Sequence, residues 1–189
     1  MKVAELRQIM AAAGWRHKRD GAGETCSHFA LSDRTVQLIA GIDHLADRQR
    51  LRAMLSLSTP VFSRAYMGIQ GRPEGHAPLC VHRQGFTLEA PLLTAAEVAR
   101  FTDDALDWAR SVDLADALAR HVALPTHAPG TGPMLHLAAL IVTGGSDRLQ
   151  TYHRAFAAGD RLGFVPYVTQ AHIARAVALC AVPQGGEAS

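Results

Sequence analysis

The chain has 189 residues, a net charge of +2 and 48% apolar residues, which is the composition of a folded protein long enough to bury a core. No run of adjacent Lys or Arg residues is present to follow a phosphate backbone, so nucleic acid is not an expected partner. No apolar run is long enough to cross a bilayer, so no membrane association is expected either.

The cysteine pattern points to a reducing compartment. Cys26, Cys80 and Cys180 are far apart, and an odd number of isolated cysteines argues against a disulfide scaffold. The N-terminal stretch MKVAELRQIM carries Glu5 and Arg7 where a secretory signal would be apolar. A cytoplasmic protein is therefore expected.

The first part of the chain changes from a helical to a strand-like period. Residues 2–13 predict an amphipathic helix, because apolar residues recur at spacings of three and four. The next three segments predict strands, and the last two of them alternate as expected for an antiparallel sheet with one buried face. These segments are residues 25–31, 35–42 and 50–58.

A short helix and a hairpin are predicted next. Residues 58–68 favour a helix, with Pro60 in its first turn. After a polar loop, residues 79–90 predict two strands that turn at Gln84 and Gly85.

Residues 94–122 give the strongest helical signal, and Thr94 with Glu97 forms a capping box at its start. The apolar residues that follow the three–four rhythm are Val98, Phe101, Ala105, Trp108, Val112, Ala115, Ala119 and Val122. The pattern fits one long helix or two helices that break near Ser111–Asp113. Packing of this apolar line against the sheet is favoured over a coiled-coil seam, because the line is rich in alanine.

The Pro/Gly-rich segment 125–132 is predicted to be a linker. It divides an α+β domain (residues 1–124) from a helical extension (133–182), with a disordered tail at 183–189. Within the extension, helices are expected at 133–143, 147–158 and 170–181. The expected fold class is therefore α+β: an antiparallel sheet packed against a long amphipathic helix, with an all-helical C-terminal extension.

The segment GDRLGFVPYVT (159–169) joins the last two predicted helices and resembles a site loop at first sight. Gly159 suits the end of a helix, and Pro166 disfavours helix just before it. Asp160 and Arg161 are placed to hydrogen-bond the backbone groups freed there. A structural connection is therefore favoured over a ligand-binding loop.

Histidine and cysteine side chains are the main candidates for chemistry. His121, His127 and His136 have no recognised metal-ligand spacing, so no metal and no cofactor are expected. Cys80 lies two residues before His82, which places both side chains on one face of a strand. A catalytic protein would use Cys80, His82 or His136, yet no nucleophile motif such as G-x-S-x-G is present.

The predicted order over residues 2–120 is helix, three strands, short helix, hairpin and long amphipathic helix. The stretches LRQIMAAAGW, LCVHRQGFTLEAPLL and FTDDALDWARSV look like the first helix, final hairpin and last helix of one known layout. In this layout the chain resembles the class I type III secretion chaperones and their relatives, small bacterial α+β proteins that bind other proteins. The resemblance implies a homodimer that lays an extended segment of a partner protein along its surface, without chemistry.

The leading hypothesis is a non-enzymatic protein-binding module, chaperone-like or immunity-like, whose protein partner is not identified by the sequence. Binding of an extended segment uses a sheet edge and an apolar groove. The candidate contact residues are Leu6, Met10, Val61, Phe62 and Tyr66. The alternative is a small hydrolase or ligand-binding protein with a pocket between the sheet and the C-terminal helices.

Overall fold

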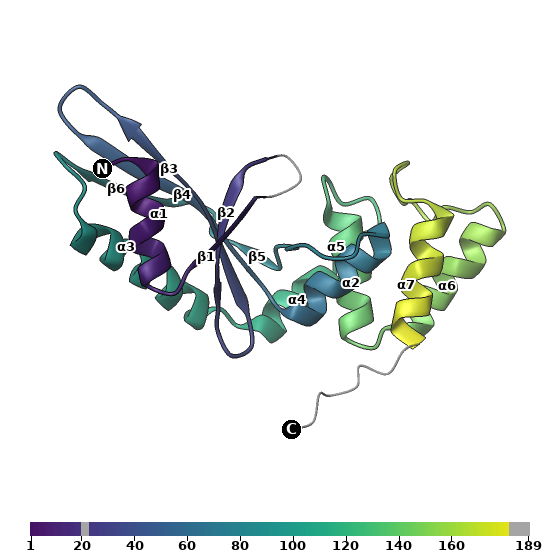
Figure 1. Ribbon diagram of the computed structural model, residues 1–189. Helices are drawn as coiled ribbons and strands as arrows, with labels where there is room; N and C mark the ends of the chain where they lie inside the picture. The colour runs from purple at the N-terminus through teal and green to yellow at the C-terminus, as the bar shows by residue number, and fades with distance from the viewer. Residues whose placement is uncertain (20–22, 182–189) are drawn as a thin grey trace. The chain divides into compact units, whose positions relative to one another are not determined.

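The computed structural model describes residues 1–19 and 23–181, and within them the expected α+β class is confirmed (Figure 1). The helices are α1 (Val3–Ala12), α2 (Pro60–Gln70), α3 (Ala95–Ser111), α4 (Leu114–Val122), α5 (Gly132–Val142), α6 (Ser146–Ala157) and α7 (Gln170–Ala181). The strands are β1 (Arg16–Arg19), β2 (Thr25–Ala30), β3 (Thr35–His44), β4 (Gln49–Ser58), β5 (Cys80–Val81) and β6 (Phe86–Ala90). The tail expected to be disordered, 183–189, lies outside the described residues.

The chain forms two compact units. Among the described residues, the α+β unit comprises Met1–Thr59 and Cys80–Val112, and the helical unit comprises Pro60–Leu79 and the residues from Asp113 onward. This division differs from the expected boundary at 125–132, because α2 and α4 also belong to the helical unit. The physical reason is packing: α2 and α4 both contact α5, the most apolar helix of the chain.

The α+β unit is built on an antiparallel sheet in the order β1-β2-β3-β4-β5, with β6 also paired to β4. Leu38 on β3 lies opposite Leu55 on β4, and the alternation of these strands places their leucines on the buried face. Helices α1 and α3 cover that face: His17 of β1 contacts the Arg7 carbonyl at 2.9 Å, and the rings of Phe86 and Phe101 lie 5.7 Å apart.

Two features of the sheet differ from the sequence prediction. β1 was not expected, because its sequence RHKR has no apolar alternation; pairing with β2 holds it in place. The two strands predicted within residues 79–90 and their turn at Gln84 and Gly85 are confirmed, but they do not pair as a hairpin, because β5 and β6 each pair with β4. The segment between them forms a tight turn, in which the Gly85 amide donates to the His82 carbonyl at 3.2 Å and Gly85 has a φ of +64°.

The helix predicted over 94–122 is broken, which is the second of the two expected alternatives. Thr94 and Glu97 form the expected capping box on α3. Val112 is extended and ends that helix, and the Asp113 carboxylate then accepts from the amides of Ala115 and Asp116 at the start of α4.

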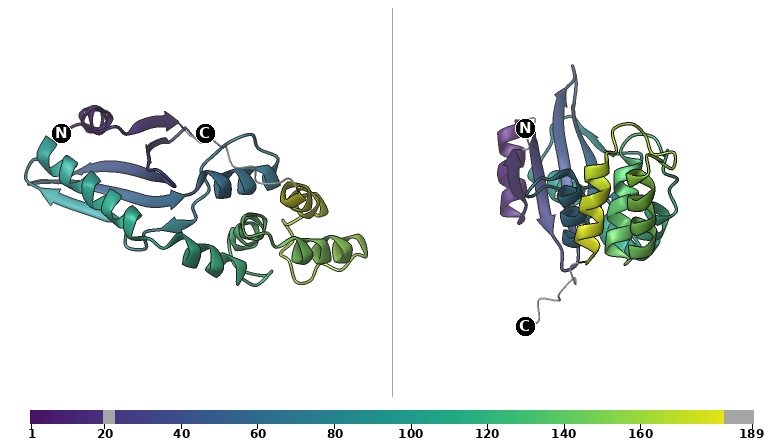
Figure 2. Two further views of the ribbon diagram at one scale, coloured as in Figure 1. Left: turned by 90° about the horizontal axis from the view of Figure 1, so that it is seen from below. Right: turned by 90° about the vertical axis from the view of Figure 1, so that its right-hand side faces the viewer.

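Helix α5 is the centre of the helical unit and contacts α2, α4, α6 and α7 (Figure 2). The expected helices at 133–143, 147–158 and 170–181 are present as α5, α6 and α7. Because α5 is surrounded, nearly all of its residues are buried, as its almost wholly apolar sequence requires.

The segment 159–169 is a hydrogen-bonded connection between α6 and α7. The Arg161 guanidinium donates to the backbone carbonyls of Phe164, Val165 and Val168. The Asp160 carboxylate accepts from the Leu162 amide at 2.8 Å. Asp160 and Arg161 therefore make the backbone contacts that the sequence predicts.

Candidate functional site

Helix α4 is apolar on two sides, although a surface helix needs only one apolar side to pack. Ala117, which is 1% exposed, belongs to the side that is buried in the helical unit. The other side carries a second apolar stripe, and its alanines are exposed. The members of this stripe are Ala115, Leu118, Ala119, Val122 and Ala123.

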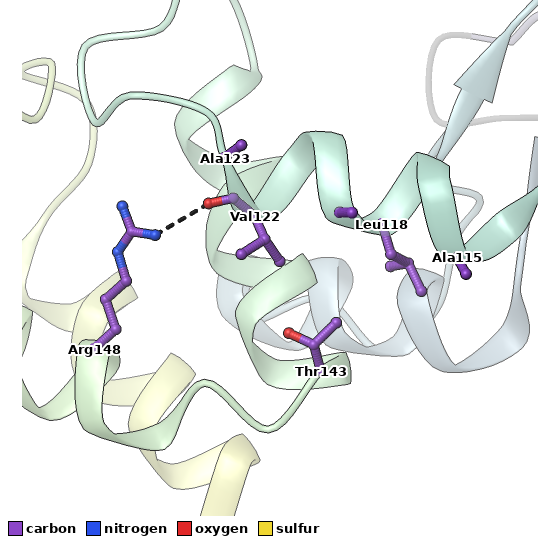
Figure 3. Close-up of a pocket in the computed structure, with 7 residues that line it drawn as sticks. Ala115, Leu118, Val122, Ala123, Thr143 and Arg148 are labelled. Carbon is purple, nitrogen blue, oxygen red and sulfur yellow. Dashed lines mark hydrogen bonds between the residues drawn. The ribbon is translucent and has the colours of Figure 1, made fainter.

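The second stripe lines an open pocket of about 490 Å³, which we call the α4 pocket (Figure 3). Thr143, at the end of α5, and Arg148, in the first turn of α6, complete its lining. The pocket lies entirely within the helical unit. Its Thr143 hydroxyl already donates to the Ala139 carbonyl at 2.9 Å, so the guanidinium of Arg148 is its main polar group.

The Arg148 guanidinium is held by contacts on two sides. Its Nε donates to the Tyr152 hydroxyl at 2.6 Å, and its Nη1 donates to the Val122 carbonyl at 3.1 Å, the bond drawn in Figure 3. It also lies over the Tyr152 ring, with the guanidinium carbon 5.7 Å from the ring centroid. Nη2 takes part in neither hydrogen bond.

Tyr152 is held in turn by His136, which is completely buried. His136 Nδ1 lies 3.1 Å from the His121 carbonyl, and because a carbonyl only accepts, Nδ1 carries the proton. Nε2 then accepts from the Tyr152 hydroxyl at 3.0 Å. Burial lowers the pKa of His136, which favours this neutral form. Both ring nitrogens are occupied, so His136 positions Tyr152 and, through it, Arg148.

The predicted partner-contact residues lie mostly in the cores of the two units. Leu6 and Met10 are buried in the α+β unit, and Phe62 and Tyr66 are buried in the helical unit. Val61 is half-buried. Burial accounts for four of these five side chains as core residues, and none of the five lines the α4 pocket.

The other candidates for chemistry do not line this pocket. Cys80, opposite Leu57 in the sheet, and His82 are half-buried in the α+β unit. The His82 ring packs edge-on against Phe86 at 4.7 Å and Trp108 at 5.4 Å, and its Nδ1 is buried without a hydrogen-bond partner. His82 therefore behaves as part of an aromatic cluster.

A second pocket, of about 200 Å³, lies in the α+β unit and is lined by charged side chains that pair with one another. Glu89 lies 3.6 Å from Arg48 and 2.6 Å from Arg50. Across residues 1–19 and 23–181, no group of three His, Cys, Asp or Glu side chains is arranged to hold a metal ion. In the same ranges no helix combines the length and the apolar character needed to span a membrane.

Fold and site together define an α+β protein whose helical unit carries an open apolar pocket beside a fixed guanidinium. Residues 2–181 match the family described as "Family of unknown function (DUF6990)", and the chain belongs to that family. Neither the curated proteins nor the solved structures gave a match to the chain.

The sequence pattern contained part of this site without identifying it. Ala115, Ala119 and Val122 were in the predicted apolar line but were assigned to the core. The missing signal was the total apolar content of α4: with Leu114, Ala117 and Leu118 also apolar, one buried side cannot hold them all. Arg148 carries no sequence signal of its own, since its role depends on the fold of α6 beside α4.

Proposed function

We propose that this protein is a non-enzymatic protein-binding module and that a second protein chain binds at the α4 pocket. The observation that carries the proposal is the exposed apolar stripe of α4. Apolar surface removed from water contributes about 25 cal/mol per Å² to association, and a groove lined along two turns of helix offers such surface to a partner. The partner side chains fill the space beside Leu118 and Val122.

The lining of the α4 pocket favours binding over chemistry. Its side chains are alanine, leucine, valine, threonine and arginine, and the threonine hydroxyl is bonded to its own helix. None of these provides an activated nucleophile paired with a base, which is the arrangement that covalent or acid–base catalysis requires. The buried His136 does not line the pocket.

Co-purification from the natural host tests the proposal. The full chain is compared with Ala119→Glu, which places a charge in the α4 pocket, and with Ala174→Glu, which makes the same change at an exposed position of α7. Native mass spectrometry then reports which polypeptides remain bound. We expect a polypeptide that is retained by the wild type and by Ala174→Glu and is lost from Ala119→Glu.

Two results count against the proposal. Equal retention of the polypeptide by all three proteins places its binding site elsewhere on the chain. A small molecule that is retained by the wild type, in place of a polypeptide, and is lost from Ala119→Glu supports the alternative of a ligand-binding protein.

A further inference from the structure

The shape of the α4 pocket selects the secondary structure of its occupant. The pocket is lined by two rows at a spacing of four: Ala115–Ala119–Ala123 and Leu118–Val122. A groove between such rows accepts the ridge of another helix, and alanine allows the two axes to approach closely. The first row extends over about 12 Å at 1.5 Å per residue, which is about two helical turns. The backbone groups of α4 are bonded within the helix, so the pocket offers no strand edge for an extended segment to join.

The charge beside the pocket selects a feature of the occupant's sequence. The ion pairs formed among the described residues do not include Arg148. Its guanidinium is fixed through Nε and Nη1, which leaves Nη2 for a further acceptor. A cation already held in position loses little side-chain freedom on binding, so its contact with an anionic group is favoured.

A second copy of this chain does not supply that anionic group. In a two-fold symmetric, antiparallel pair of α4 helices, Arg148, beside Val122 at the C-terminal end of one helix, faces the N-terminal end of the other. The Asp113 carboxylate at that end already accepts from the amides of Ala115 and Asp116. The acidic residue of α4 nearest the stripe, Asp116, lies outside the pocket lining and already pairs with Arg120 at 3.3 Å. Self-association through the pocket therefore offers each guanidinium only carboxylates that already have partners.

Nucleic acids and small acids fit the pocket less well than a helix. A nucleic acid needs several cations along its backbone, and the pocket has one. A small apolar acid gains affinity by burying most of its surface, whereas the alanines of this pocket are exposed along one side. A helix needs to bury only one of its sides.

We infer that the occupant of the α4 pocket is an amphipathic α-helix of another protein, which places an Asp or Glu carboxylate against Nη2 of Arg148. This inference rests on the proposed function and adds the partner's helical form and its charge. The apolar ridge of the partner lies between the two rows of α4, and its acidic residue borders that ridge on the side of α6.

Selection from a displayed peptide library tests the inference. The library combines helix-forming peptides, which have a Leu/Ala ridge and randomised flanking positions, with linear random peptides. The baits are the full-length wild type, Arg148→Gln, Arg148→Glu and the pocket-blocked Ala119→Glu, each checked for folding by circular dichroism. We expect helical peptides with Asp or Glu at one flanking position for the wild type, no charge preference for Arg148→Gln, and Lys or Arg at that position for Arg148→Glu.

The best wild-type peptide and its Glu→Gln or Asp→Asn counterpart are then compared by fluorescence anisotropy. Loss of the carboxylate is expected to weaken binding by about tenfold, in the range of a hydrogen bond to a charged group. On Arg148→Gln the two peptides are expected to bind equally. This second measurement isolates the contact with Arg148 from any general effect of the substitution on the pocket.

The possible failures are distinguishable. The selected peptides could bind the wild type but not Ala119→Glu, and yet show no preference for an acidic residue or be extended. Either result overturns the inference and leaves the proposed function standing. Enrichment by the wild type that does not exceed enrichment by Ala119→Glu overturns the inference and removes the α4 pocket as the site of the proposed function.

Discussion

Helices α3 and α4 follow one another in the chain and share the same apolar rhythm, but they use it differently. In α3 the apolar side is buried and the opposite side carries Asp103, Asp104 and Asp107, so one interface accounts for all of its large apolar residues. In α4 the rhythm continues, yet Ala115 and Ala119 face solvent while Ala117 is buried. A helical period shows that apolar residues share a side, but only their total number shows whether a helix has one apolar side or two.

Matched substitutions on α4 give the largest expected effect and test this contrast directly. Ala117→Glu places an unpaired charge in the core of the helical unit and is expected to lower the free energy of unfolding by about 3–5 kcal/mol. Ala119→Glu, on the same helix, is expected to change it by no more than about 0.5 kcal/mol, because the position is exposed. Urea unfolding followed by circular dichroism measures both.

Similar losses of unfolding free energy in Ala117→Glu and Ala119→Glu would contradict the difference between the two sides of α4. That result would mean that the stripe with Ala119 is buried in the folded protein, and the α4 pocket would then be part of the core. A small effect at both positions would instead show that α4 is not packed on α5 through Ala117.

The next effect concerns the polar contacts that fix the edge of the pocket. Tyr152→Phe removes the hydroxyl between Arg148 and the buried His136, and leaves His136 Nε2 without its donor. Because that nitrogen is buried, the expected loss is about 1–3 kcal/mol of unfolding free energy.

Tyr167→Phe is the matched control for Tyr152→Phe. The Tyr167 hydroxyl donates to the Gly130 carbonyl at 2.6 Å, but its side chain is 46% exposed, so water can replace the bond. The expected loss is under about 1 kcal/mol. If thermal unfolding ranks the two variants in the opposite order, the network around Tyr152 does not support Arg148.

Local patterns predicted most of the fold. Alternation located β3 and β4, the capping box located the start of α3, and glycines located the ends of several helices. β1 was missed because a basic edge strand has no apolar period of its own. The two strands and the turn within 79–90 were predicted correctly, but their pairing as a hairpin was wrong. Each strand pairs with β4, and a local pattern does not show which strand is the partner.

The candidate site was harder to predict for a related reason. Leu6, Met10, Phe62 and Tyr66 have the apolar character of a binding surface, but core residues have the same character, and only burial separates the two. The pocket depends on Arg148 standing beside Val122 across 26 positions of sequence. Such a contact arises from the packing of α4, α5 and α6, which no single helix encodes.

Substitutions of the N-cap residues compare how the first turns of α3 and α4 are stabilised. Thr94→Ala removes the cap of α3, and Asp113→Ala removes the cap of α4. Each is expected to lower the unfolding free energy by about 1 kcal/mol, because each leaves backbone amides without an acceptor. Measurement by urea unfolding should find the two losses within a factor of two.

An Asp113→Ala variant as stable as the wild type would contradict this account of the helix break. It would mean that Asp113 does not fix where α4 begins. The position of the second apolar stripe would then be set by the contacts of α4 alone.

The smallest expected effect is a dependence on pH that comes from the buried histidine. Burial lowers the folded-state pKa of His136 below its ordinary value of 6.5, so near and below that pH the unfolded chain binds more protons than the folded one. The contribution of neutral His136 is therefore complete above pH 6.5 and is lost progressively as the pH falls through and below it toward the folded-state pKa. Burial also lowers the pKa of His28 in the α+β unit, so both units weaken in the same direction.

His136→Gln separates the contribution of His136 from that of His28, because glutamine keeps polar atoms near Tyr152 but does not titrate. The variant is expected to be less stable at neutral pH, with a shallower fall in unfolding free energy between about pH 7 and pH 5. Urea titrations at several pH values measure the slope. An unchanged slope would show that His136 takes up no proton on unfolding, and the neutral ring would then not be what orients Tyr152 and Arg148 beside the α4 pocket.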